Sequence, residues 1–150
     1  IGDWSSDVCS SDLTLGTLLH ARDLEDQRLA MEEQLKRHAT QDTLTGLFNR
    51  RRFFEALNDQ LLQSRRYKAQ MTLALLDVDH FKQINDLHGH AAGDAVLRAL
   101  ADELRQTLRD TDVVGRIGGE EIALLLTCTD ADQAQGALER LREQIGRAHV

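Results

Sequence analysis

Residues 71–79, MTLALLDVD, form a short apolar run that ends in acidic residues. The run is too short for a core helix and is bounded by polar segments, a pattern typical of a strand buried on both faces. In VVGRIGGEEIALLL, residues 113–126, two further apolar runs surround Gly118 and Gly119. That pattern predicts a β-hairpin, because a tight hairpin turn needs residues with positive φ. The chain is therefore expected to contain a sheet in which the strand of residues 71–79 is central.

Amphipathic helices are expected before, between and after these strands. Apolar residues recur at helical spacing over about 49–64, 91–109 and 131–144, as in helices that cover one face of a sheet. The polar segment 81–94, FKQINDLHGHAAGD, is expected to be a connection between a strand and a helix. The order helix, strand, helix, hairpin, helix predicts an α/β fold with a sheet flanked by helices.

Residues 14–40 are rich in Glu, Gln and Arg and predict a helix that precedes the α/β domain. A thin stripe with steps of four and three residues follows its surface through Leu24, Arg28, Met31, Leu35 and His38. The stripe is weakly similar to a coiled coil, and a solvated helical linker is the alternative. The apolar start of this segment, residues 13–19, also fits the end of a membrane helix.

Both ends of the chain differ in character from the sequence between them. Residues 3–13, DWSSDVCSSDL, translate back into a DNA string similar to a common sequencing-library adapter. Residues 145–150, IGRAHV, translate back into the start of its reverse complement. We therefore expect residues 1–13 and 145–150 to be adapter-derived, with a helical linker at 14–40 and an α/β domain at 41–144.

The composition excludes several classes of function. A net charge of −7 argues against a general nucleic-acid binder. No apolar run reaches the roughly 18–20 residues that cross a bilayer. The two cysteines, Cys9 and Cys128, lack the spacing of a zinc site, and only Cys128 lies outside the adapter-like ends. A single free thiol is expected of a reducing compartment such as the cytoplasm.

Four acidic residues are candidates for a metal site. Asp77 and Asp79 end the strand of residues 71–79, and Glu120 and Glu121 follow the diglycine. If the hairpin lies beside that strand, these carboxylates converge, and their mutual repulsion calls for a cation. Oxygen ligands favour Mg²⁺ or Mn²⁺ over zinc, and such ions suggest phosphate chemistry. The alternative is a set of exposed acids that close a strand and a turn.

The polar segment after the first strand supplies further candidates. Lys82 is placed to meet phosphate oxygens, while Asn85 and Asp94 offer an amide and a carboxylate that complement the edge of guanine. Loop caps and helix caps are the alternative roles for these two residues. His88 and His90 form an H-x-H pair. Because no further His or Cys stands at metal-ligand spacing, a structural role is expected for the pair.

Three motifs of the chain resemble those of the GGDEF-domain diguanylate cyclases: DTLTGLFNRRRF at 42–53, DVDHFKQINDLHGHAAGD at 77–94 and RIGGEEIALLL at 116–126. The resemblance covers residues 42–144. It implies a mixed central sheet flanked by helices, similar to nucleotidyl cyclases and polymerase palms. It also implies an enzyme that condenses two GTP molecules into cyclic di-GMP and releases two pyrophosphates, with one GTP in each subunit of a homodimer.

The resemblance further implies roles for individual residues in catalysis. Mg²⁺ or Mn²⁺, with two ions per active site, would be bound by Asp77, the backbone carbonyl of Val78, Glu120 and Glu121. Glu120 would also be the base for the ribose 3′-hydroxyl, and Lys82 would stabilise charge in the transition state.

Substrate contacts follow from the same resemblance. Asn85 and Asp94 match the residues that bind guanine in the family. Gly118 and Gly119 would let the backbone approach the triphosphate, because a side chain at either position would collide with it.

Arg109 and Asp112 match the family's site for inhibition by cyclic di-GMP, both in residue type and in distance from the diglycine. Arginine grips a phosphate or stacks on a purine, and aspartate binds the guanine edge. An ordinary salt bridge in a turn is the alternative. Ile122 departs from the family, which usually has Phe there; changes in packing are expected, more than a loss of chemistry.

The intact acidic and diglycine motifs favour an active diguanylate cyclase, the output domain of a bacterial signalling protein. The alternatives are a catalytically silent GGDEF domain that binds GTP or cyclic di-GMP and regulates a partner, and a plain α/β interaction module. Because the family's domain continues past residue 144, this chain is expected to be inactive and poorly soluble, with its IALLL strand as an unpaired edge. The linker helix is expected to govern dimerisation, and membrane contact is expected only through a missing upstream region.

Overall fold

The structure is a computed structural model that describes residues 7–148, with side chains described for residues 18–143 and 145. Parts of the two segments predicted to be adapter-derived, residues 1–6 and 149–150, lie outside the described residues. The chain divides into two compact units, one up to residue 39 and one from residue 40 onward. Each unit is described by itself below.

The first unit is a single helix, α1 (Asp7–Thr40), which confirms the helix predicted before the domain. Its described side chains from residue 18 to residue 39 are all exposed. Ion pairs one turn apart, such as Arg28 with Glu32 at 3.6 Å, lie on its surface and contribute only a few tenths of a kcal/mol each. In the described part of the chain, no helix is both long and apolar enough to cross a membrane.

The second unit is built on a mixed four-stranded sheet, which confirms the predicted fold class. Its strands are β1 (Phe48–Asn49), β2 (Met71–Leu76), β3 (Val113–Arg116) and β4 (Ile122–Thr127), in the order β1-β3-β4-β2. The short β1 runs parallel to β3, and the other pairs are antiparallel. Strands β3 and β4 form the hairpin that the diglycine pattern predicts.

The prediction that the strand of residues 71–79 is central is wrong. Within the described part of the chain, strand β2 ends at Leu76 and lies at the edge of the sheet, with β4 as its one partner strand. Its side chains Leu73 and Leu75 are 49% and 73% exposed. The central position belongs to β4, whose residues from Ile122 to Leu126 are all buried. A short apolar run looks the same for an edge strand with one covered face as for a strand covered on both faces.

Three helices lie close to their predicted ranges: α2 (Arg50–Tyr67), α4 (His90–Thr107) and α5 (Ala131–Ala148). The prediction of a polar connection over residues 81–94 is wrong, because most of that segment is helical. Helix α3 (Phe81–His88) comes first, and Gly89, with φ of 83°, separates it from α4. Helix α3 has eight residues and none that is fully buried, and a pattern of about two turns is too short to distinguish a helix from a loop.

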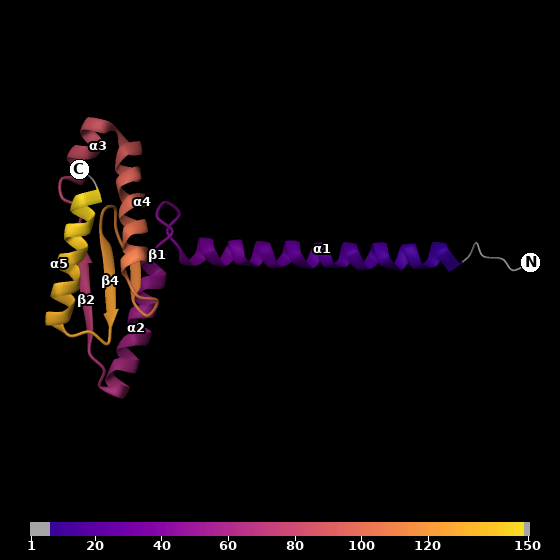
Figure 1. The fold of residues 1–150 in the computed structure, drawn as a ribbon, viewed down its shortest axis with the longest axis horizontal. Helices are drawn as coiled ribbons and strands as arrows, with labels where there is room; N and C mark the ends of the chain where they lie inside the picture. The colour runs from indigo at the N-terminus through magenta and orange to yellow at the C-terminus, as the bar shows by residue number, and fades with distance from the viewer. Residues whose placement is uncertain (1–6, 149–150) are drawn as a thin grey trace, which may run out of the picture. The chain divides into compact units, whose positions relative to one another are not determined.

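The two faces of the sheet are covered by different helices (Figure 1). On one face, Ile122 and Leu124 of β4 pack with Leu100 and Leu104 of α4 and with Leu141 of α5. On the other face, Ala123 and Leu125 pack against Phe53 of α2. Ile122, the position where the family usually has Phe, is fully buried, so its side chain acts on core packing. This arrangement leaves the ends of β2 and β4 free to carry polar residues.

Candidate functional site

The register of β2 and β4 decides where the predicted acidic residues lie. Leu76, the last residue of β2, is paired with Ile122, the first residue of β4. Asp77 therefore follows the end of β2 beside the point where Glu121 precedes β4. The hairpin does lie beside the acid-ended strand, as the metal hypothesis requires, and the two segments come from positions far apart in the sequence.

The acidic residues lie at the adjoining ends of β2 and β4, but their carboxylates do not form a cluster. Asp77, Asp79 and Glu121 are exposed, and Glu120 is half-buried. Within the part of the chain that the structure describes, no three His, Cys, Asp or Glu side chains are grouped closely enough to hold a metal ion. The donor set nevertheless has the chemistry of a Mg²⁺ site, since it consists of carboxylate oxygens and one backbone carbonyl.

The loop of residues 117–121 joins β3 to β4 and carries the diglycine. The backbone N–H groups of Ile117 and Gly118 both donate to the carbonyl of Glu121, at 3.0 and 3.3 Å. The expectation of positive φ at Gly118 and Gly119 is wrong, because among the described glycines only Gly46 and Gly89 have it. A hairpin connection of this length does not need the mirror-image turn that a two-residue connection requires.

The diglycine has a steric function instead. A Cβ at Gly118 would lie 3.2 Å from Cδ and 3.3 Å from Cβ of Glu121, whose side chain folds over the glycine. A Cβ at Gly119 would meet nothing within 4 Å. Open space therefore borders Gly119, and a ligand is able to approach the backbone there without a side chain in between.

A network that the sequence did not indicate holds this loop. Arg116, the last residue of β3, donates from Nε and Nη2 to the carbonyl oxygen of Gly119, at 3.0 and 2.7 Å. Its Nη1 donates to the carboxylate of Asp42 at 3.1 Å. The same carboxylate accepts hydrogen bonds from N and Oγ1 of Thr45, at 2.9 and 2.7 Å. The turn DTLTG, residues 42–46, is thus joined to the diglycine loop through one guanidinium group.

The Asp42 carboxylate is held in its charged form. Its burial alone would raise the pKa, but the hydrogen bonds from Thr45 and the nearby Arg116 guanidinium outweigh that effect and lower the pKa of Asp42. The Arg116 and Asp42 side chains are only 17% and 23% exposed. The only sequence signals for this pair were the aspartate that begins the DTLTG turn and the arginine two residues before the diglycine.

The two candidate guanine-binding residues lie at the contact between α3 and α4. Asn85 of α3 is half-buried, and its Oδ1 is buried without a hydrogen-bond partner. It packs against Gly93 of α4, where an added Cβ would lie 2.9 Å from Cγ of Asn85 and 3.0 Å from Cζ of Phe81. Asp94 is the next residue of α4, with its side chain 46% exposed and 4.0 Å from the guanidinium of Arg98. The structure therefore places Asn85 and Asp94 at the same contact between α3 and α4.

The remaining candidates near the end of β2 are less constrained. The carbonyl of Val78, a predicted metal ligand, accepts a hydrogen bond from the N–H of Phe81 at 3.2 Å, which leaves its second lone pair available. Lys82 lies in the first turn of α3 and is exposed. His88 and His90 flank Gly89 and are both exposed, so neither side chain is part of the core.

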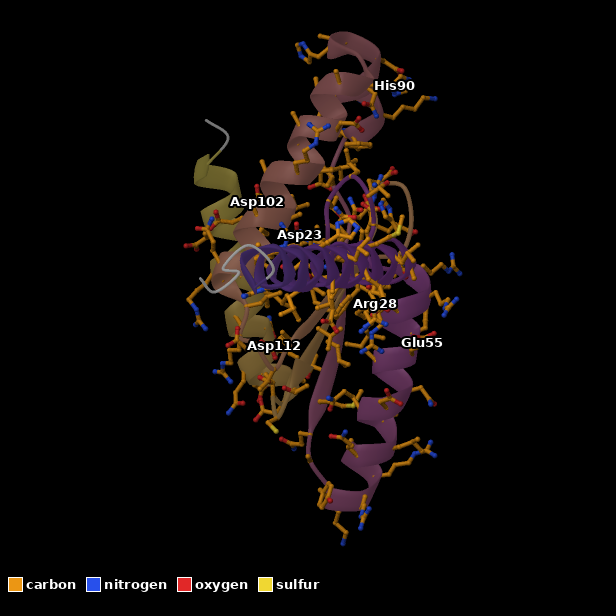
Figure 2. The ribbon with its side chains drawn as sticks, turned by 90° about the vertical axis from the view of Figure 1, so that its right-hand side faces the viewer. Asp23, Arg28, Glu55, His90, Asp102 and Asp112 are labelled. Atoms are coloured by element: carbon orange, nitrogen blue, oxygen red, sulfur yellow. The ribbon has the colours of Figure 1, made fainter. Side chains whose placement is uncertain are left out.

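Arg109 and Asp112 border a separate cavity of about 790 Å³ between the end of α4 and α5. Asp112 lies beyond the C-terminal end of α4, and His90 lies at the other end of that helix (Figure 2). Its carboxylate accepts hydrogen bonds from the backbone N–H of Arg109, at 3.2 Å, and of Thr127, at 3.1 Å. The contact between Arg109 and Asp112 is therefore a backbone turn and not a salt bridge. Arg140 of α5 also lines the cavity, a residue that spacing alone did not suggest.

The fold and the site together define the class of protein. A mixed sheet flanked by helices, with acidic residues and a glycine loop at one end of adjacent strands, is the arrangement of nucleotidyl cyclases and polymerase palms. A model of the family described as "Diguanylate cyclase, GGDEF domain" matches residues 39–150. The chain belongs to this family.

Relatives with names and solved structures agree with this assignment. The chain is 45% identical over 122 residues to diguanylate cyclase DgcP of Pseudomonas aeruginosa, a match that covers 81% of the chain and 17% of DgcP. It is 41% identical over 128 residues to diguanylate cyclase DgcM of Escherichia coli, a match that covers 85% of the chain and 31% of DgcM. The chain thus spans less than a third of either relative.

Two solved structures show the same fold. The coiled coil and GGDEF domain of DgcB from Caulobacter crescentus, in complex with c-di-GMP, matches 85% of the chain and 68% of its own length, with a TM-score of 0.73 and 32% identity. Diguanylate cyclase SiaD of Pseudomonas aeruginosa, in complex with its activator SiaC, matches 93% of the chain and 54% of its own length, with a TM-score of 0.69 and 38% identity.

Proposed function

We propose that this domain is the catalytic part of a diguanylate cyclase, which converts two GTP molecules into cyclic di-GMP and two pyrophosphates. The observation that carries the proposal is the placement of two chemically different groups on the same half of the fold. Asn85 and Asp94, the candidates for guanine binding, lie where α3 meets α4. Acidic residues and the diglycine loop lie at the adjoining ends of β2 and β4. One group suits a base and the other suits a metal-bound triphosphate.

Guanine selectivity rests on Asn85 and Asp94. Because Oδ1 of Asn85 is packed against Gly93, its amide NH₂ group is the part left to donate to the guanine carbonyl. The Asp94 carboxylate accepts from the ring N–H and the amino group of the same base. Adenine presents the opposite pattern of donors and acceptors, so the pair discriminates against it.

The residues present fit a divalent cation in donor type. Asp77, the carbonyl of Val78, Glu120 and Glu121 would hold Mg²⁺ or Mn²⁺, with two ions expected per site as in the family. The bound cation supplies positive charge that neutralises phosphate oxygens. Glu121, which folds over Gly118 in the free domain, has to turn outward to take part.

The remaining groups position and activate the substrate. Glu120 accepts the proton of the ribose 3′-hydroxyl. The 3′-oxygen bonds to the α-phosphorus of the other GTP, and pyrophosphate leaves from that phosphorus. Lys82, exposed on the first turn of α3, offsets charge on the phosphates. Each domain holds one GTP, so two domains must face each other, and a homodimer is required. Helix α1 raises the effective concentration of the two domains when it pairs with its copy.

The cavity bordered by Arg109 and Asp112 is the proposed site of product inhibition. Arg109 and Arg140 both line it, and among the described residues neither guanidinium has a carboxylate partner within ion-pair distance. Two unpaired guanidinium groups beside an aspartate suit a ligand with phosphates and guanine bases, such as cyclic di-GMP.

GTP is supplied in the cytoplasm, where we place the domain; attachment of the whole protein to a membrane would need a region upstream of it.

The test replaces Glu120 with Gln, which keeps the shape of the side chain and removes its charge. The variant is best made in a chimaera in which residues 42–144 replace the matching segment of DgcP, so that the rest of that enzyme is present. Loss of a base and metal ligand should slow formation of cyclic di-GMP from GTP by roughly 10³-fold or more.

Glu55→Gln is the matched control, because Glu55 is an exposed residue of α2 outside the site. Undiminished turnover in the Glu120→Gln chimaera would remove Glu120 from the mechanism. A parent chimaera that binds GTP without forming product would instead support the catalytically silent regulator.

A further inference from the structure

Arg105 joins helix α4 to the turn that supports the diglycine loop. Its guanidinium donates from Nη2 to the backbone carbonyl of Thr45, across a separation of 60 residues in the sequence. Its Nη1 pairs with Asp102 on its own helix at 2.8 Å. Asp102 is labelled on α4 in Figure 2. The side chain thus has one partner on α4 and one partner on the turn of residues 42–46.

The turn is shaped to admit this side chain. Gly46 has φ of 66°, and a Cβ at this position would lie 2.6 Å from Nη2 of Arg105. Any other residue would be strained there and would also displace the guanidinium. The Thr45 side chain is buried, at 5% exposure. The guanidinium of Arg105 therefore lies close over Gly46, at a position where a glycine leaves room for it.

A continuous chain of hydrogen bonds leads from α4 to the diglycine loop. Arg105 holds the carbonyl of Thr45, and Thr45 donates to Asp42 through both N and Oγ1. Asp42 accepts from Arg116, which in turn donates to the carbonyl of Gly119. These five residues come from three separate segments of the chain: the turn of residues 42–46, helix α4, and the end of β3 with its loop. The position of the loop relative to α4 is thus set through side chains.

We infer that Arg105 is a positioning residue, which fixes the diglycine loop at a set distance from helix α4. This inference rests on the proposed function in one respect: α4 carries Asp94, the proposed guanine reader, and the loop borders the proposed triphosphate site. The distance between them must match the length of one GTP molecule. Arg105 touches neither base nor phosphate and acts through Asp42 and Arg116.

The first test measures hydrogen exchange in the free chain, with no nucleotide present. Arg105→Ala should speed exchange of the Ile117 and Gly118 amides by about tenfold, as expected when a supporting hydrogen bond is lost. Arg105→Lys, which retains a donor for the Thr45 carbonyl, should restore most of the protection. The amide of Leu124 in the central strand serves as the internal reference for intact folding.

Three further variants test this chain of hydrogen bonds. Asp102→Ala is the matched control, because it removes the partner of Arg105 on α4 and leaves the bond to Thr45; exchange in the loop should not change. Arg116→Ala alone should also speed hydrogen exchange of the Ile117 and Gly118 amides. Combining it with Arg105→Ala should then add nothing further, since both residues act in one chain. Unchanged loop exchange in Arg105→Ala, or full additivity with Arg116→Ala, would overturn the inference.

The second test measures nucleotide binding and separates this inference from the proposed function. Arg105→Ala should weaken binding of a non-hydrolysable GTP analogue by about tenfold and leave GMP binding nearly unchanged, because only the triphosphate reaches the loop. Equal weakening of both nucleotides would overturn the positioning role. If the parent chain bound neither nucleotide while the exchange results held, the proposed function would fail and Arg105 would still position the loop.

Discussion

Asp42 is the residue through which the diglycine loop and the DTLTG turn are joined. Its carboxylate accepts hydrogen bonds from Thr45 and from Arg116, in a setting where it is only 23% exposed. These donors lower its pKa although burial opposes them. A group whose pKa is lower in the folded state than in the unfolded state stabilises the fold above its unfolded pKa, and that contribution is lost as the pH falls through the folded pKa.

Asp42→Asn should therefore destabilise the domain by about 1–3 kcal/mol at neutral pH, as expected when hydrogen bonds to a charged group are lost. The difference from the parent chain should be constant above about pH 5 and should shrink below about pH 4, as the Asp42 carboxyl itself becomes protonated. Urea unfolding across this pH range measures it. Asp59→Asn, at an exposed position of α2, should show no such loss, and a deficit for Asp42→Asn that persisted at low pH would contradict the charge argument.

Gly93 is a second single residue with a measurable consequence. Alanine is normally the better helix residue, by up to about 1 kcal/mol. At Gly93, however, the new methyl group would press on Asn85 and Phe81 at 2.9 and 3.0 Å. Gly93→Ala should therefore destabilise the domain by about 1–3 kcal/mol, the usual cost of overpacking, and should move Asn85 away from its position.

The matched control is Gly136→Ala in α5, where the new methyl group would come no closer than 3.7 Å to Arg140. This variant should gain about 0.5–1 kcal/mol. Thermal unfolding of both variants compares them directly. Stabilisation of the Gly93 variant by the same amount would show that α3 does not pack on α4 as described.

At the scale of elements, the exposed edge of the sheet is β2 and not the IALLL strand. The prediction that IALLL forms an unpaired edge is wrong, because β4 lies between β3 and β2. Strand β2 instead presents one unpaired edge and the exposed side chains Leu73 and Leu75. An apolar edge of this kind is a template for pairing with other chains, so aggregation of the chain as given should begin there.

Leu75→Lys should reduce that aggregation without cost to folding. Leu75 is 73% exposed, so its loss should change the free energy of unfolding by no more than about 0.5 kcal/mol. Light scattering during prolonged incubation measures the effect. Leu29→Lys makes the same change of charge at an exposed position of α1, which belongs to the other unit of the chain. An equal gain in solubility from both substitutions would attribute the effect to net charge and not to the edge.

At the scale of the whole molecule, the proposed function requires two sites with opposite effects on turnover. The proposed catalytic site lies at the end of β2, and the cavity bordered by Arg109, Asp112 and Arg140 lies between the C-terminal end of α4 and α5. Asp112 also holds the backbone of Arg109 and Thr127, so its substitution would disturb the turn itself. Arg109, whose side chain is exposed, gives the cleaner test.

Arg109→Ala in the DgcP chimaera should raise the concentration of cyclic di-GMP that halves the rate by about tenfold or more, as expected for the loss of a charge-assisted contact to phosphate. Each variant is compared with its own uninhibited rate. Arg142→Ala, which removes an exposed arginine of α5 paired with Glu139, should leave the inhibition unchanged. Inhibition that persisted unaltered in Arg109→Ala would show that the product binds elsewhere.

The sequence by itself determined the mixed sheet, the hairpin, the long helices and the family, because periodic apolar patterns and three long motifs are local properties of the chain. It also indicated Asn85, Asp94 and the acidic residues as candidates by their chemistry. It did not determine which strand is central, because that depends on how distant strands pair. Nor did it indicate α3, because a helix of eight residues with few apolar side chains looks like a polar loop in the sequence.

Tertiary structure alone decided how distant segments meet. The pairing of Leu76 with Ile122 places Asp77 beside Glu121, and no local pattern specifies that register. The bonds from Arg105 to Thr45 and from Arg116 to Asp42 join residues that are 60 and 74 positions apart. Such contacts leave no periodic trace in the sequence, because one long polar side chain on a helix surface looks like any other until the fold supplies its partner.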